Sequence, residues 1–135
     1  MSAVLAITLL AASDLAIVHR VAVRDASPAL VEHLTKRLVR DIPGIEPSSE
    51  EDADLVIGYD EVTVGDGVSW KASLFRLDCQ EGDCTKHIYV VHEFGYLNGT
   101  CRRGESPIHA FAAELKQAIL APGSCTLELP AYVSP

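Results

Sequence analysis

The first clear pattern in the chain is an alternation of apolar and less apolar positions over residues 15–24. The apolar positions recur at a spacing of two and so share one face, which holds Leu15, Ile17, Val21 and Val23, with His19 among them. A period of two is typical of a half-buried β-strand. We therefore predict a first strand over these residues.

The next segment changes to helical spacing. Ser27 can accept hydrogen bonds from the first free amides of a helix, and Pro28 suits the first helical position. Apolar residues then recur three or four positions apart, at Leu30, Val31, Leu34, Leu38, Val39 and Ile42, until Pro43-Gly44 interrupts the pattern. The spacing predicts a helix over residues 28–42 with one buried stripe.

Three strands and a second helix are predicted after the polar, acidic loop of residues 46–52. Strands 55–64 and 68–77 flank a Gly-Asp-Gly turn, and the third alternates over residues 87–96 until Asn98-Gly99 ends it. Ser106-Pro107 repeats the helix-start signal of Ser27-Pro28. The buried stripe of this second helix is predicted at Ile108, Phe111, Ala112, Leu115 and Ile119.

The predicted order is therefore β-α-β-β-β-α, a single α+β domain. Two helices with one apolar stripe each can cover one face of a four-stranded mixed sheet. A right-handed crossover is expected between the first two strands if they are parallel. We expect the other sheet face to carry Ser69, Lys71, Tyr89 and Glu93 and to meet solvent or a partner.

Composition and charge narrow the class of function. With 135 residues and 48% apolar content, the chain can bury one core and is not disordered. Its net charge of -8 argues against a nucleic-acid partner, since phosphate binding needs a concentrated basic face. The basic residues Lys36, Arg37 and Arg40 lie at the end of the first helix, where cations favour the helix dipole.

The uncharged run SAVLAITLLAA at residues 2–12 has the length of a signal-peptide core and is too short to span a bilayer. No Lys or Arg precedes it, and the alternative is a buried first strand. We predict a signal peptide over residues 1–12, a domain over residues 13–125 and a C-terminal tail over residues 126–135. The chain is then periplasmic or secreted, with no membrane span after processing.

Four cysteines lie in the C-terminal half, and an even number in a small exported chain predicts disulfides. Cys79 and Cys84 flank a tight turn, whereas Cys101 and Cys125 bracket the second helix. Of the three possible connectivities, we predict these two pairs. Structural disulfides are favoured over redox activity, because thioredoxin-like chemistry uses a two-residue gap at a helix start.

Three features of the layout carry a resemblance to known proteins. A strand and helix over residues 15–42 lead to the segment ADLVIGY at residues 53–59, and a hairpin strand ending in Leu77-Asp78 precedes the final helix. This arrangement resembles the small domains of bacterial envelope proteins of the TolB amino-terminal, CsgG and LpoB type. The resemblance implies a non-enzymatic periplasmic module that works by contact with other envelope proteins, and it transfers no catalytic residue.

No catalytic or cofactor motif is evident from the residues. A composite hydrolytic or metal site is conceivable at His19, His92, Glu93 and Asp60 if the first and fourth predicted strands pair, because imidazole and carboxylate groups bind metals and transfer protons. The leading hypothesis is an accessory binding module of the cell envelope. The alternatives are a small histidine-dependent hydrolase or metal-binding enzyme, and an inhibitor or immunity-type protein with an acidic surface.

Overall fold

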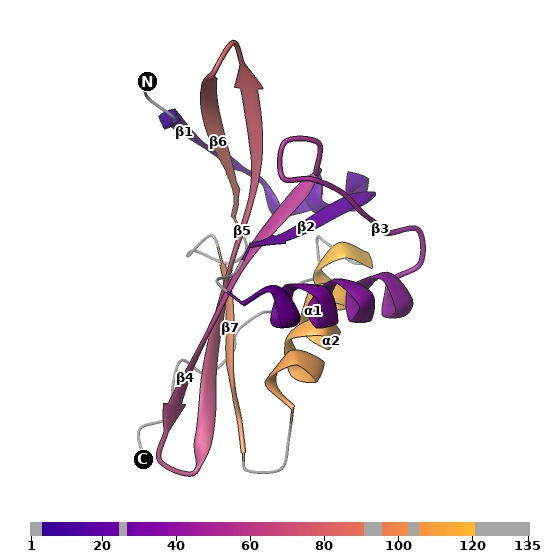
Figure 1. Ribbon diagram of the computed structural model, residues 1–135, viewed down its shortest axis with the longest axis vertical. Coiled ribbons are helices and arrows are strands. Elements are labelled where there is room, and N and C mark those ends of the chain that lie inside the picture. Colours follow the sequence, from indigo (N-terminus) through magenta and orange to yellow (C-terminus); the bar gives the residue numbers. More distant parts are fainter. Residues whose placement is uncertain (1–3, 25–26, 91–95, 103–105, 121–135) are drawn as a thin grey trace.

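The chain folds into a seven-stranded mixed sheet with two helices on one side (Figure 1). The computed structural model describes residues 4–24, 27–90, 96–102 and 106–120. Its elements are β1 (Val4–Leu10), the 3-10 helix η1 (Ala12–Ile17), β2 (Arg20–Arg24), α1 (Pro28–Asp41), β3 (Glu46–Pro47), β4 (Leu55–Val64), β5 (Gly67–Gln80), β6 (Asp83–Tyr89), β7 (Tyr96–Cys101) and α2 (Pro107–Leu120). The α+β class and the two helices are confirmed, but the prediction of four strands is wrong.

Strand order follows β1-β6-β5-β4-β2-β3, and β7 pairs with β5 as well. The strands β2 and β4 are parallel, as the crossover through α1 requires. The hairpin of β4 and β5 is confirmed around its predicted turn, with Val64 opposite Gly67. Strand β5 runs for 14 residues and pairs with three other strands, more than any other strand in the described part of the chain.

Both helices begin as their sequences predict. The Ser27 hydroxyl accepts a hydrogen bond from the Leu30 amide at 3.3 Å, and the Ser106 hydroxyl accepts one from the His109 amide at 3.2 Å. The buried residues of the two helices are Leu34 and Leu38 in α1 and Phe111, Ala112, Leu115, Ala118 and Ile119 in α2. Val39, predicted in the buried stripe, is 36% exposed and lies at its margin.

The main core lies between the helices and the sheet. Three aromatic rings form its centre: Phe111 of α2 lies 5.1 Å from Tyr59 and 5.4 Å from Trp70, measured between ring centroids. The opposite sheet face has only a small buried cluster, made of Ala22, Ala53, Val56 and Phe75. The two faces of the sheet therefore differ strongly in what covers them.

The predicted first strand is wrong in its first half. Residues 12–17 form η1, and the strand β2 begins only at Arg20. Asp54 explains this start, because its Oδ2 accepts hydrogen bonds from the amides of His19 and Arg20, at 2.9 Å each. Residue 18 is buried instead of residue 17, so the period of two is lost, and His19 is exposed instead of facing the core.

The predicted third strand of the meander is divided into β6 and β7. Ile88 pairs with Phe75, and Tyr96 pairs with Ser73. These two pairs are two residues apart on β5 but eight residues apart on the opposing chain, so the opposing chain has six more residues between them than β5 has. Both segments nevertheless lie antiparallel to β5 on the same side of it. The predicted strand end at Asn98-Gly99 is also wrong, since β7 continues to Cys101.

Candidate binding face

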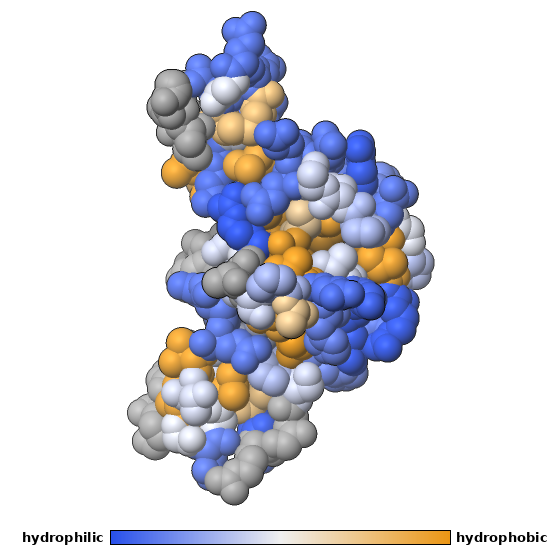
Figure 2. All heavy atoms as spheres, viewed as in Figure 1, coloured by the Kyte–Doolittle hydropathy of each residue, from blue (hydrophilic) through white to orange (hydrophobic). Residues whose placement is uncertain are grey.

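The sheet face turned away from the helices is the main candidate for a functional surface. Its described apolar side chains are Val56, Phe75, Leu77 and Ile88, with Val62, Ile7 and Leu9 exposed around them. Apolar patches are visible along this side in Figure 2. The prediction of Tyr89 on this face is wrong: the side chain is fully buried on the helix side and its hydroxyl donates to the Asp54 carbonyl at 2.8 Å.

A hollow forms where two small residues meet across the sheet. Gly58 of β4 lies directly opposite Ser73 of β5, and a Cβ at Gly58 would lie 3.8 Å from the Ser73 Cβ. An open hollow of about 630 Å³ lies here and extends past β4 to the helix side. Its lining combines Gly58, Ser73, Phe75 and Lys86 of the open face with Leu30 of α1 and the helix-side residues Tyr59 and Glu61, and Arg24 and Asp60 complete it. Its size is within the range of cavities that bind a small molecule or a large side chain.

Two cations lie over the ring at the border of this hollow. The Arg24 Cζ is 5.1 Å from the Phe75 ring centroid, and the Lys86 Nζ is 4.3 Å from it. Both distances are within the range of cation–π attraction. The hollow thus has a basic and aromatic border on one side, while Asp60 and Glu61 line another part of it.

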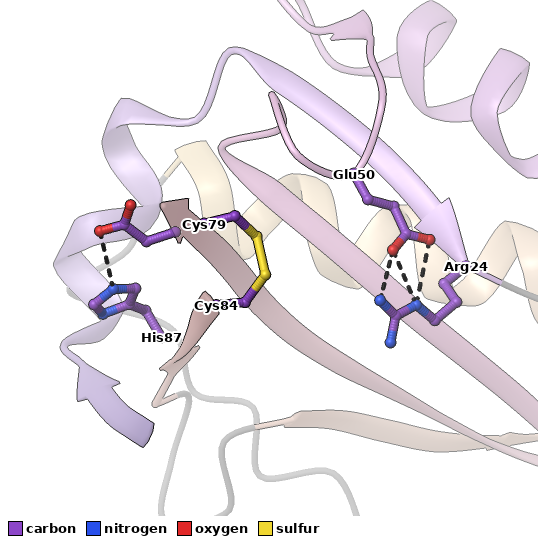
Figure 3. The surroundings of a disulfide bond; sticks show 6 residues. Arg24, Glu50, Cys79, Cys84 and His87 are labelled. Carbon is purple, nitrogen blue, oxygen red and sulfur yellow. Dashed lines mark hydrogen bonds and ion pairs between the residues drawn. A yellow bond between two sulfur atoms is a disulfide. The ribbon is translucent and has the colours of Figure 1, made fainter. Parts of the chain in front are cut away.

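The loop predicted over residues 46–52 is wrong at its start, because Glu46–Pro47 forms β3. From the connection after β3, Glu50 orients Arg24. The Arg24 Nε donates to both carboxylate oxygens of Glu50, at 3.2 Å each, and the Arg24 Nη2 donates to Glu50 Oε1 (Figure 3). This hydrogen bonding raises the pKa of Arg24. The ion pair is partly exposed, so its contribution is the position of the guanidinium more than stability.

Asp52 of this loop and Asp54 after it also have structural partners. Asp52 accepts a hydrogen bond from the Ser49 hydroxyl at 3.2 Å, and Asp54 binds the two amides at the start of β2. Among the residues that the structure describes, no group of three or more His, Cys, Asp and Glu side chains could hold a metal ion.

The four residues of the composite site are only partly described. His19 is exposed before β2, and Asp60 is exposed on β4 and lines the hollow. His92 and Glu93 lie outside the described residues. Among the described strands, β2 pairs with β3 and β4, β6 pairs with β1 and β5, and β7 pairs with β5, so the composite site stays a prediction.

The disulfide between Cys79 and Cys84 is present and joins directly opposed residues of β5 and β6 (Figure 3), with their Cα atoms 4.0 Å apart. Nearby, His87 Nε2 lies 3.8 Å from the Asp78 carboxylate. Cys101 is buried at the end of β7. Cys125 and the tail of residues 126–135 lie outside the described residues, so the second disulfide stays a prediction.

The basic cluster at the end of α1 forms ion pairs within the protein. Arg37 and Arg40 both contact Asp41, at 3.1 and 3.0 Å, and lower the pKa of that carboxyl. Arg37 also contacts His109 of α2, and Lys36 pairs with Glu32 one turn earlier. These contacts link α1 to α2 and join the cations to carboxylates of their own helix.

Apart from Asp60, which was a candidate for the composite site, the residues that line the hollow were not predicted as site residues from the sequence. Gly58 and Ser73 are 15 positions apart in the chain, and only the register of β4 and β5 places them together. The available signal was a small residue in each strand on the face opposite Ile57 and Leu74. Arg24 and Lys86 gave no signal, because isolated cations are common on strands.

Comparison of the chain with protein-family models, curated proteins and solved structures finds no match. No helix among the described residues is long and apolar enough to cross a membrane.

Proposed function

We propose that this chain is a non-enzymatic accessory module of the bacterial cell envelope, or a secreted one, that binds another protein through the open face of its sheet. The observation that carries this proposal is the set of exposed or partly exposed apolar side chains on this face, Val62, Leu77 and Ile88, beside the hollow over Gly58 and Ser73. The Phe75 ring between them is itself only 2% exposed, because Arg24 and Lys86 lie over it. Exposed apolar patches that are bordered by polar groups are typical of protein interaction sites.

Two further features support this function. The uncharged segment of residues 2–12 is a candidate signal peptide, and the Cys79–Cys84 disulfide suits an oxidising compartment. The resemblance to envelope domains of the TolB amino-terminal, CsgG and LpoB type implies the same kind of role. The partner is an envelope or secreted protein that can place an apolar side chain in the hollow, near the acidic residues Asp60 and Glu61.

The binding surface can be tested by site-specific cross-linking in the native cells. A photoreactive phenylalanine at Ser73 is expected to cross-link to one envelope or secreted protein, whereas the same group at the exposed Gln117 of α2 is not. Ser73→Trp should fill the hollow and reduce recovery of that protein at least tenfold, while Gln117→Trp should not. Equal cross-linking from both positions, or none from position 73, would refute the proposed surface.

Export has a separate readout. The mass of the protein purified from native cells is expected to correspond to a chain without residues 1–12 and with oxidised Cys79 and Cys84. A chain that stays in the cytoplasm with its N-terminus intact and its thiols reduced would contradict the proposed localisation.

A further inference from the structure

The outermost strand β1 attaches to the rest of the sheet through one neighbour. Among the described strands it pairs with β6 alone, in parallel, with a register that runs from Ala6 opposite Thr85 to Leu10 opposite Tyr89. The Leu10 carbonyl also accepts a hydrogen bond from the Val90 amide at 2.7 Å. In Figure 1, β1 lies beside the long hairpin of β5 and β6.

The core depends little on this strand. Of the side chains described for residues 7–10, only Leu10 packs against the core, and it does so while partly buried. Ile7 and Leu9 are 62% and 69% exposed, and the first described residue of the buried core is Leu15. Among the described side chains, loss of residues 7–10 would therefore take away part of one edge ladder and little buried apolar surface.

Strand β6 is held in place by β5 and by a disulfide, and neither of these contacts involves β1. Six residue pairs join β6 to β5, and the Cys79–Cys84 disulfide closes the hairpin beside its two-residue turn. Glu81 and Gly82 in that turn have φ values of 56° and 90°, as a tight hairpin turn requires. We expect β6 to keep its extended shape, and its outward row of amides and carbonyls, when β1 is absent.

We propose that the edge of β6 is a strand-acceptor site, which residues 4–10 occupy in the full chain and an extended, uncharged apolar segment of the partner protein occupies in the exported chain. This inference rests on the proposed function, because export is what would remove residues 1–12. The chemistry of the segment follows from the strand seen in place, VLAITLL, which carries no charge. A free strand edge takes such segments by main-chain hydrogen bonding.

The site is continuous with the open sheet face. Ile7 pairs with Lys86 and Leu9 pairs with Ile88, and both β6 residues adjoin Phe75, Lys86 through its ammonium and Ile88 by pairing. Alternate side chains of an added strand would therefore extend the apolar face. One partner segment could bind the β6 edge and the patch around Phe75 together.

The test uses the full-length chain, folded first and cut afterwards. A protease recognition sequence is inserted between Ala11 and Ala12, and a fluorescent peptide of residues 1–12 with a lysine tail is added before and after cutting. The cut protein is expected to take up the peptide, and the uncut protein to bind at least tenfold more weakly, because its tethered strand has a high effective concentration. Circular dichroism confirms that the inserted chain is folded in both states.

Two N-methylated peptides show whether a strand is really added. Alternate amides of a strand point to opposite sides, so methyl groups on the amides of Ile7 and Leu9 block one side, and methyl groups on those of Thr8 and Leu10 block the other. One peptide should lose at least tenfold in affinity and the other should bind nearly as the unmodified peptide does. Equal binding of both, or no uptake by the cut protein, would overturn the inference.

The two proposals can fail separately. Uptake of the peptide by the cut protein, together with an intact N-terminus in native cells, would retain the acceptor edge and refute export. A processed N-terminus without peptide uptake would retain export and refute the acceptor edge.

Discussion

Gly99 allows the indole of Trp70 to pack directly on strand β7. A Cβ at this position would lie 2.7 Å from Trp70 Cζ2, and Trp70 is 2% exposed. The indole also meets the Phe111 ring edge-on, with the ring centroids 5.4 Å apart. A strand glycine, normally unfavourable, is here a requirement of packing.

We predict that Gly99→Ala lowers the free energy of unfolding by about 1–3 kcal/mol through overpacking. Gly58→Ala is the matched control, since its new Cβ would meet Ser73 at an ordinary 3.8 Å. Urea unfolding can be followed by the fluorescence of Trp70, the single tryptophan of the chain. Equal stability of the two variants would contradict this account.

Asp54 links three parts of the structure. Its carboxylate accepts the His19 and Arg20 amides, and its carbonyl accepts the Tyr89 hydroxyl. We predict that Asp54→Ala destabilises the fold by about 1–3 kcal/mol, because two amides lose their acceptor. Asp54→Asn keeps an acceptor oxygen and should lose less, as measured by urea unfolding; a larger loss in the asparagine variant would argue against this role.

Glu114 makes the stability of the folded state depend on pH. Burial raises the pKa of this carboxyl in α2, so the folded state retains a proton that the unfolded state releases. Stability is therefore lost as pH rises from the ordinary glutamate pKa through the raised one, and the loss persists at neutral pH. Glu114→Gln should be more stable by up to about 0.5 kcal/mol at pH 7, a value kept small because the group is partly solvated.

Urea unfolding of both proteins at pH 7 and at about pH 3, below the ordinary carboxyl pKa, checks this expectation. The advantage of Glu114→Gln should disappear at the lower pH, where Glu114 is neutral in both states. An advantage of the same size at both values would show that the glutamine acts through packing and not through charge.

At the scale of elements, the hairpin of β5 and β6 combines a tight turn with a disulfide. The bond joins residues separated by five positions, and a loop of this length is expected to contribute about 2 kcal/mol through the entropy of the unfolded chain. The paired substitution Cys79→Ser and Cys84→Ser should therefore lower the free energy of unfolding by about that amount. A reductant should lower the stability of the parent chain by at least this amount, and a loss that the variant also shows would come from the predicted second disulfide, Cys101–Cys125. Unchanged stability of the paired variant would contradict this account.

The elements with local signals were predictable, and those that depend on distant partners were not. Helices α1 and α2 begin at Ser-Pro signals and show a helical period within their own sequence. The late start of β2 depends on the Asp54 side chain, 34 residues beyond Arg20, and the division of β6 from β7 depends on the register of β5. The hollow has the same origin, because Gly58 and Ser73 meet only through strand pairing.

Across the whole molecule, stability should decrease from the middle of the sheet to the β1 edge. Residues 56–58 of β4 have strand partners on both sides, and Ile57 lies in the main core together with residues of α1 and α2. In contrast, β1 pairs with one described neighbour and exposes Ile7 and Leu9. Local opening is easiest where few buried contacts are lost. Hydrogen exchange measured by mass spectrometry should therefore be slowest in β4 and much faster in β1; equal protection of both would show that β1 is an integral part of the cooperative unit.

Strand β5 also limits how the sequence can vary. Its 14 residues align β4, β6 and β7 at once, with Trp70, Ala72 and Leu74 toward the helices and Ser73 and Phe75 toward the open face. The register of β5 therefore sets the register of its neighbours. Deletion of Ser73 would turn every side chain on one side of the deletion to the opposite face of the sheet. A longer loop elsewhere could not restore the register within β5. Insertions and deletions should therefore be confined to the connections between strands.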